Sequence, residues 1–316
     1  MQNTASPPAL EAPPAWLDGL LTGQRAALAR AITAVENETP EAAAVLRAIR
    51  GRLGHALVVG FTGAPGAGKS TLVSAYVEEL RHRDATVGIV AVDPSSPLTG
   101  GAILGDRIRM SRHATDPGVF VRSLASRGHL GGLSRTAARV IDVFDASGRD
   151  VVVVETVGTG QSEVEIAEIA DVRVVVNAPG LGDDIQAIKA GILEIADILV
   201  VNKSDLPLAE RSARQLAAMA SQREGRSVPV LRTSATTGQG VAELADAIAA
   251  LGRRKRPDPR ARLRRLLLGL AQDWFRRRLQ ALPDAALDTL ARDLLDGARD
   301  TDAAMLELLT LLDKDR

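Results

Sequence analysis

One short segment constrains the fold of this chain more than any other. The apolar run ALVVGFT is followed by a glycine-rich octapeptide and then by TLVSAYVEEL, which has the pattern of a helix. Strand, GxxxxGKS and helix in this order predict a phosphate-binding loop, because glycines let successive backbone N–H groups point at phosphate oxygens. A chance glycine-rich turn is the alternative, and the two correct flanks disfavour it. The predicted nucleotide contacts are Gly63, Ala64, Pro65, Gly66, Ala67, Gly68, Lys69, Ser70 and Thr71.

A second phosphate element is predicted at the end of a later apolar run, Asp150–Glu155. That run continues into Thr156, Val157 and Gly158, which gives an ExxG pattern. The carboxylate of Glu155 can hold magnesium directly or through water, together with the Ser70 hydroxyl. The N–H of Gly158 can contact a γ-phosphate, and Lys69 can reach the β- and γ-phosphates as a catalytic group. ExxG alone is a weak signal, and its value lies in its place after the phosphate loop.

A third motif concerns the choice of base. The run Ile198–Val201 ends in NKSD, which supplies Asn202, Lys203 and Asp205. A carboxylate only accepts hydrogen bonds, so Asp205 can pair with the two donors of guanine, whereas the N1 acceptor of adenine would repel it. The stem of Lys203 can lie along the base and Asn202 can brace the loop. Backbone N–H groups of Ser234 and Ala235 can meet the guanine carbonyl. The three motifs in this order favour GTP over ATP.

The rest of the chain alternates short apolar runs with helical patterns, which predicts an α/β fold with a mostly parallel sheet flanked by helices. One of the helices in this alternation is expected at 185–195. Further helices are expected before this region, at about 16–36 and 40–53, and after it, within 263–312, and no internal repeat is found. The predicted division is a flexible tail at 1–15, an N-terminal helical extension at 16–54, a P-loop GTPase core at 55–252 and a C-terminal helical arm at 253–316. The strands are predicted at Ala56–Thr62, Thr86–Val92, Val119–Ser123, Asp150–Glu155, Val172–Asn177, Ile198–Val201 and Val228–Thr233.

Composition excludes several classes of protein. The 316 residues contain no cysteine, which removes disulfides, thiolate metal sites and iron–sulfur clusters. Four histidines are scattered without a metal-binding spacing, and the few aromatic residues disfavour a stacking platform for single-stranded nucleic acid. The formal net charge is zero, so no nucleic acid or membrane partner is expected. No long apolar stretch or secretory signal is found, and a cytoplasmic location is expected.

Two basic features are less easily assigned. Only five of the 39 basic residues are lysines, and two of them, Lys69 and Lys203, fall in the nucleotide motifs. The run Arg253–Arg265 contains two prolines and is predicted to be a solvated linker, with RNA binding as the disfavoured alternative.

The loop between the phosphate loop and ExxG is the predicted switch. The segment 93–110 begins at a strand end and is rich in Gly, Pro and Ser. Asp93 and Asp106 are candidates for the magnesium shell or for positioning the attacking water. A surface ion pair with a nearby arginine is the alternative for Asp106.

The segments DPSSPLTGGAILGDRIRM, FVRSLASRGHLGGLS and ETVGTGQSE, with NKSD, resemble the methylmalonyl-CoA mutase-associated GTPases of the ArgK/MeaB family over residues 56–250. The resemblance implies a homodimer joined by the C-terminal helices and adenosylcobalamin-dependent methylmalonyl-CoA mutase as partner. It implies that GTP hydrolysis protects or reactivates the mutase and gates cofactor delivery, with the adenosyltransferase as a further candidate partner. It makes the segment 177–189 a switch that meets the partner, with Asp183 and Lys189 as coupling residues; a solvated helix start is an equal alternative for these two.

The residue after Gly158 is Thr159 and not glutamine, so the chain lacks the water-orienting glutamine of Ras-like enzymes. We therefore expect slow intrinsic hydrolysis that the partner accelerates. Two other classes stay open: a P-loop kinase that phosphorylates a small molecule or a protein, and a structural dimer that only binds nucleotide.

Overall fold

Seven parallel strands form one sheet in the computed structural model, in the order β3-β2-β4-β1-β5-β6-β7. The structure describes residues 14–93, 111–113, 115–125, 132–156, 169–180, 194–221, 228–255 and 258–313. The strands are β1 (Leu57–Gly63), β2 (Val87–Asp93), β3 (Val119–Ala125), β4 (Val151–Thr156), β5 (Val172–Asn177), β6 (Ile198–Val201) and β7 (Val230–Arg232). The mostly parallel α/β fold predicted from the sequence is confirmed.

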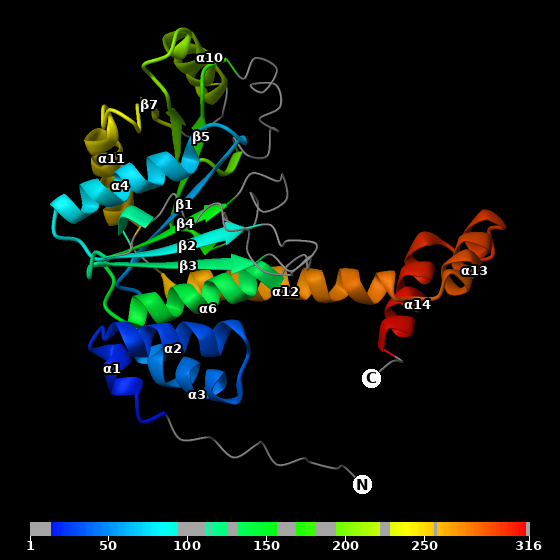
Figure 1. Cartoon of the computed structure of the whole chain (residues 1–316). Helices are drawn as coiled ribbons and strands as arrows, with labels where there is room; N and C mark the ends of the chain where they lie inside the picture. Colours follow the sequence, from blue (N-terminus) through cyan, green and yellow to red (C-terminus); the bar gives the residue numbers. More distant parts are fainter. Residues whose placement is uncertain are drawn as a thin grey trace. The chain divides into compact units, whose positions relative to one another are not determined.

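Helices cover both faces of the sheet (Figure 1). On one face lie α4 (Lys69–His82) and α11 (Val241–Lys255), which pack on each other and on the central strands. On the other face α6 (Gly132–Ala146) separates the sheet from the N-terminal helices α2 (Arg25–Glu36) and α3 (Pro40–Ile49). The helix α10 (Ala209–Ser221) packs beside β6 and β7.

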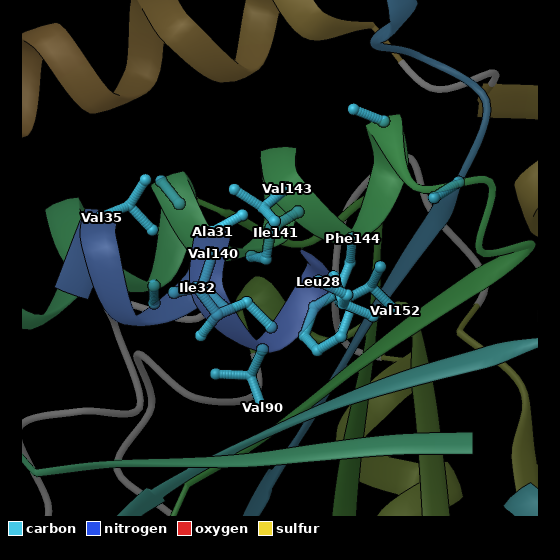
Figure 2. Close-up of a cluster of buried hydrophobic side chains, with 14 of the residues drawn as sticks. Leu28, Ala31, Ile32, Val35, Val90, Val140, Ile141, Val143, Phe144 and Val152 are labelled. Carbon is cyan, nitrogen blue, oxygen red and sulfur yellow. The ribbon is translucent and has the colours of Figure 1, made fainter. Parts of the chain in front are cut away.

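The strands are buried on both faces, which explains their continuous apolar runs. Along β4, Val152 and Val154 belong to the cluster under α6, whereas Val151 and Val153 belong to the cluster under α4. Figure 2 shows the first cluster, with labelled side chains from α2, α6 and the strands: Leu28, Ile32, Val140, Phe144, Val90 and Val152.

One carboxylate joins the N-terminal helices to the core. Asp145, near the end of α6, is 1% exposed and accepts hydrogen bonds from the N–H groups of Gly54 at 2.6 Å, His55 at 3.0 Å and Ala56 at 2.9 Å. These residues lead directly into β1. The bonds therefore fix where the helical extension ends and β1 begins.

Three sequence-based boundaries differ from the structure. The helix expected at 16–36 is divided into α1 (Leu17–Leu21) and α2, because Gly23 has a φ of 74° that interrupts the helix. The predicted linker 253–265 is largely helical: α11 continues to Lys255 and α12 (Pro259–Gln280) begins at a proline, which the first helical turn accepts. The strand expected at 228–233 is shorter, and the helix expected at 185–195 lies mostly outside the described residues.

The chain forms two compact units, residues 1–266 and 267–316, and α12 belongs to both. In the second unit α13 (Asp284–Leu295) contacts α14 (Thr301–Asp313), and Arg299 bridges Asp293 and Glu307. The predicted four-part division of the chain stays a prediction. None of the helices within the described residues has the length and apolar character to cross a membrane.

Candidate functional site

The glycine-rich loop connects the end of β1 to the first turn of α4. Gly63 has a φ of 138°, and a Cβ at this position would lie 1.9 Å from the carbonyl oxygen of Val176 in β5. Only glycine lets the two backbones approach this closely. Gly68 has a φ of 83°, and its Cβ would lie 2.6 Å from Nδ2 of Asn202. The close approach of β5 therefore requires glycine at position 63, and the close approach of the NKSD segment requires it at position 68. These requirements hold whether or not a phosphate is bound.

Two lysines donate to carbonyl oxygens of this loop. Lys69, the first residue of α4, is 7% exposed and donates from Nζ to Gly63 O at 2.7 Å and Ala64 O at 3.0 Å. Lys203 donates from Nζ to Gly66 O at 2.8 Å. The NKSD lysine thus crosses from the base-reading motif to the phosphate loop. Positive charge is concentrated at the N-terminus of α4, where a phosphate would also meet the helix dipole.

The expected magnesium ligands Ser70 and Glu155 are in contact. The Ser70 hydroxyl donates to Oε1 of Glu155 at 2.5 Å, and both residues are buried, at 9% and 1% exposure. Oε2 of Glu155 is buried as well. A hydroxyl and a carboxylate are the oxygen ligands that magnesium prefers, so these residues fit a magnesium ion bound to nucleotide phosphates. No cluster of three or more His, Asp or Glu able to hold a metal occurs among the described residues.

Asn202 connects the phosphate loop to the loop after β7. Its Nδ2 donates to Ala67 O at 3.0 Å and to Gly68 O at 3.3 Å. Its Oδ1 accepts from Thr233 Oγ1 at 3.1 Å and from the N–H of Ala235 at 3.2 Å. Asn202 is 1% exposed, and its bonds to Ala67 O and Thr233 Oγ1 are buried. Asn202 is thus a brace for the loop, as its motif suggests.

Asp205 is exposed and accepts a hydrogen bond of 2.7 Å from the Ser234 hydroxyl. This bond holds the pKa of Asp205 below its usual value. The carboxylate therefore stays ionised and keeps the acceptor character that guanine reading requires.

The loop after β7 differs in one respect from expectation. The Ser234 N–H donates to Gln239 O at 2.9 Å, and the Ala235 N–H donates to Asn202 Oδ1. Both N–H groups that were expected to face a guanine carbonyl therefore have partners within the protein. The Ser234 hydroxyl instead orients the carboxylate of Asp205. A guanine carbonyl would have to compete with Oδ1 of Asn202 for the N–H of Ala235.

Of the other expected site residues, the structure describes Asp93 and Thr71 but not four further ones. Asp93 is the last residue of β2, paired in register with Ala125, at the same edge of the sheet as Glu155. Thr71 is exposed on α4 and lines a cavity of about 690 Å³ that also touches Ala235. Four expected site residues lie outside the described residues: Asp106, Gly158, Asp183 and Lys189.

Three polar residues near the site were not singled out from the sequence. Thr62 is the penultimate residue of β1, and Thr156 and Asn177 end β4 and β5. All three are at most 2% exposed, and their strand neighbours Phe61, Val176 and the alternate residue Val153 belong to the cluster under α4, which places the three on the opposite face. Thr62 Oγ1, Thr156 Oγ1 and Asn177 Nδ2 are buried without a hydrogen bond. In the sequence, each of them could have been identified as a polar residue at the end of an apolar run.

Comparisons with known proteins identify relatives of this chain. The sequence model described as methylmalonyl Co-A mutase-associated GTPase MeaB matches residues 28–265. A putative GTPase of Pyrococcus horikoshii is 51% identical over 234 residues, 72% of this chain and 74% of that protein. The GTPase ArgK of Escherichia coli is 47% identical over 190 residues, 59% of this chain and 57% of ArgK. The mitochondrial methylmalonic aciduria type A homolog of Mus musculus is 36% identical over 249 residues, 72% and 60% of the two chains.

Solved structures agree on the fold. The crystal structure of LAO/AO transport system kinase superposes with a TM-score of 0.73 at 27% identity, covering 94% of this chain and 96% of that one. HypB from Helicobacter pylori, solved in complex with nickel, gives a TM-score of 0.50 at 15% identity, covering 69% and 96%. The second similarity concerns the fold alone.

Proposed function

The chain belongs to the MeaB family of methylmalonyl-CoA mutase-associated GTPases, and from this premise we propose that it is a GTP-hydrolysing chaperone of adenosylcobalamin-dependent methylmalonyl-CoA mutase. GTP hydrolysis follows from the family and from relatives that are named GTPases. The proposal adds that hydrolysis protects or reactivates the mutase and gates delivery of its cofactor. The proposed place of action is the cytoplasm.

The observation that carries the nucleotide part of the proposal is the double bridge from NKSD to the phosphate loop. Asn202 bonds to Ala67 and Gly68, and Lys203 bonds to Gly66. Contacts made by a guanine base with Asp205 and Lys203 would therefore act on the same loop that holds the phosphates. This coupling supports a site in which base selection and phosphate binding are linked.

In the proposed site Lys69 moves from the loop carbonyls to the β- and γ-phosphates, because phosphate oxygens carry more charge than peptide carbonyls. Backbone N–H groups of the loop and the N-terminus of α4 bind the remaining phosphate oxygens. Ser70 and Glu155 would hold magnesium, and the bound ion would supply positive charge to neutralise the phosphates. Asp93 and Asp106 stay candidates for orienting the attacking water.

We expect the intrinsic rate to be low, because no glutamine follows Gly158 directly. The mutase would raise the rate through contacts with the switch segments, with Asp183 and Lys189 as the proposed coupling residues. A nucleotide-dependent coupling of about 1–3 kcal/mol is enough to change partner affinity roughly 5- to 150-fold.

We further propose that the protein acts as a homodimer through its C-terminal arm. The arm exposes apolar side chains on α13 and α14 to water, and a dimer interface would bury them. Among them are Leu294, Leu295, Leu306 and Leu309. The adenosyltransferase is a further proposed partner. Light scattering of the purified chain tests the dimer: a mass near the 33.3 kDa of one chain at micromolar concentration contradicts it.

The mutase proposal is tested by measuring phosphate release from GTP with and without purified methylmalonyl-CoA mutase, beside complex formation in GDP and in a GTP analogue. We expect a faster turnover with the mutase and nucleotide-dependent affinity. A turnover unchanged by saturating mutase, with equal affinity in both nucleotides, overturns the proposal. Lys69→Ala is the control, and full protection of the mutase by this variant would indicate a structural role only.

A kinase activity is the second candidate, favoured by the similarity to a structure named a transport system kinase. Labelled γ-phosphate distinguishes the two. Release as inorganic phosphate supports the GTPase chaperone, whereas transfer of the label to another molecule supports a kinase.

A further inference from the structure

A row of buried polar groups crosses the carboxyl end of the sheet on the face opposite α4. Thr62 in β1 and Thr156 in β4 each come one position after a pair of residues in register, so the two threonines lie side by side. Asn177 in β5 lies two positions beyond Val175, the residue that pairs with Thr62. Because β1 lies between β4 and β5, the three side chains form one row on one face of the sheet.

Each member of the row has a polar atom without a partner. All three residues are at most 2% exposed. Thr62 Oγ1, Thr156 Oγ1 and Asn177 Nδ2 make no hydrogen bond in the part of the chain that the structure describes. Oδ1 of Asn177 accepts from the N–H of Ala178 at 2.8 Å, so only the donor end of this amide is left over. Buried polar atoms normally have a partner, because leaving one unsatisfied is costly.

Neighbours along the sheet do not supply the missing bonds. Adjacent strands lie about 4.8 Å apart, a separation that one small molecule spans with two hydrogen bonds of about 2.8 Å. The row is apolar at both ends, since Val92 in β2 pairs with Thr156 and Val201 in β6 pairs with Asn177. The spacing of the two threonines therefore suits a small bridging molecule better than a direct bond.

The hydrogen-bonding character of the row fits water. A hydroxyl donates and accepts, whereas the amide nitrogen of Asn177 only donates. A cation would be repelled by this donor, and an anion would lie close to the carboxylate of Glu155, the neighbour of Thr156 in β4. Water can accept from the amide and donate to a hydroxyl, and a buried water makes about three such bonds.

The row also lies directly beside the nucleotide site. Thr62 precedes Gly63 of the phosphate loop, and Thr156 follows Glu155 of the ExxG motif. The third member accepts, through its backbone carbonyl, the N–H of Asn202 at 2.8 Å. A water that joins the row would therefore hold the ends of the strands that carry the phosphate loop, ExxG and NKSD.

We propose that Thr62, Thr156 and Asn177 bind an internal water molecule and act through it as positioning residues for the magnesium–nucleotide site. The water bridges the ends of β1 and β4 and so fixes the place of Glu155 relative to the phosphate loop. The positioning role rests on the proposed magnesium site, whereas the water site itself can be tested without nucleotide.

Thr62→Val and Thr156→Val test the water site, because valine nearly keeps the shape of threonine and removes the hydroxyl. Each change takes one partner from the water and leaves other buried groups unsatisfied. The Tm of the full chain without nucleotide should therefore fall by about 2–6 °C. Magnetic relaxation dispersion of the water oxygen should show the loss of a long-lived internal water.

Hydroxyls buried in a dry row would give the opposite result, because valine would then remove an unsatisfied group at no cost. An unchanged or raised Tm in either variant, or an undiminished signal from internal water, overturns the water site. If one variant fails to fold, the other decides.

The positioning role is tested by the magnesium dependence of nucleotide binding, measured with a fluorescent, non-hydrolysable GTP analogue. Both valine variants should need roughly tenfold more magnesium for half-maximal binding. Thr62→Ser and Thr156→Ser keep the hydroxyl and should need the same concentration as the unaltered chain. Equal magnesium dependence in the valine and serine variants overturns the positioning role.

Thr39→Val is the matched control. Oγ1 of Thr39 is also buried without a hydrogen bond among the described residues, but it precedes α3 in the N-terminal extension. This variant should leave the magnesium dependence unchanged, and a shift equal to that of the valine variants in the row would overturn the assignment. An unaltered chain that binds no GTP analogue contradicts the proposed function, and the Tm comparison still decides the water site.

Discussion

The Ser70 hydroxyl donates a hydrogen bond of 2.5 Å to Oε1 of Glu155, and this bond joins the first turn of α4 to the end of β4. The two residues are 85 positions apart in the sequence. Both are oxygen ligands of the kind magnesium binds, and they come from two separate motifs. The bond therefore supports the proposed pairing of GKS with ExxG in one metal site.

Replacing this carboxylate should impair hydrolysis without unfolding the protein. Glu155→Gln keeps the shape and the acceptor for Ser70 but removes the charge that attracts magnesium. GTP turnover should fall by about 10- to 100-fold. Phosphate release at several magnesium concentrations measures this, with Glu210→Gln on the exposed part of α10 as control. An unchanged rate and magnesium dependence would contradict a metal role for Glu155.

Asn202→Ala should weaken nucleotide binding and stability together. The change leaves the Ala67 carbonyl and the Ala235 N–H without their partner, which costs about 1–3 kcal/mol. The Kd for GDP should rise by roughly tenfold, as measured by calorimetry, and Tm should fall. Gln215→Ala, exposed on α10, is the matched control. Loss of stability with unchanged GDP affinity would confine Asn202 to a structural role.

Asp205→Asn should change base preference. Asparagine offers a donor where guanine also presents one, but it complements the carbonyl that xanthine carries at the same position. The affinity for GDP should fall by at least about 100-fold relative to that for xanthosine diphosphate. Competition binding with both nucleotides measures the ratio, and Asp246→Asn in α11 is the control. An unaltered ratio would mean that Asp205 does not read the base.

The Ser234–Asp205 bond predicts a pH effect. Because the bond lowers the pKa of Asp205, its charged form should persist as the pH falls to the usual carboxyl range of about 3.9. Ser234→Ala should return the pKa upward, so GDP affinity should begin to fall at a higher pH in the variant. Fluorescent GDP binding between about pH 4 and 7 provides the comparison. Superimposable pH curves for the two proteins would refute this coupling.

Lys255 predicts a stability effect far from the nucleotide. Its Nζ donates to Asp197 Oδ2 at 2.6 Å and to Asp171 O at 3.0 Å, and Arg173 binds the same carboxylate. Burial alone would raise the pKa of Asp197, but the bonds from Arg173 and Lys255 bring it below its usual value. The folded state therefore gains stability above the unfolded pKa and loses it as the pH falls through the folded one.

Lys255→Ala should reduce the free energy of unfolding at neutral pH by about 1–3 kcal/mol, since Arg173 remains. The acid-induced loss of stability should also begin at a higher pH. Denaturant unfolding at several pH values measures both effects, with Arg253→Ala, an exposed residue in the same last turn of α11, as control. Equal stability of the two variants at neutral pH would contradict the role given to Lys255.

The sequence predicted the elements of the fold better than their ends. Apolar runs such as VVVVET identified each strand, because burial on both faces leaves a signal in a few consecutive residues. The sequence did not predict the interruption at Gly23. It also did not predict the helical character of 253–255 and 259–265, because a basic run with prolines resembles a linker unless the neighbouring contacts are known. Lys255 was accordingly assigned to that linker, although it binds a buried carboxylate 58 positions away.

By itself the sequence determined the phosphate loop, the order of the three motifs and the alternation of strands and helices, because each of these is a pattern of residues close together in the chain. Only the tertiary structure decided which motif contacts which. The strand order places β1 between β4 and β5, so that Glu155 meets Ser70 and Val176 closes on Gly63. The same packing brings Asn202 to Ala67 and Lys203 to Gly66, because such contacts join chain segments up to 137 positions apart.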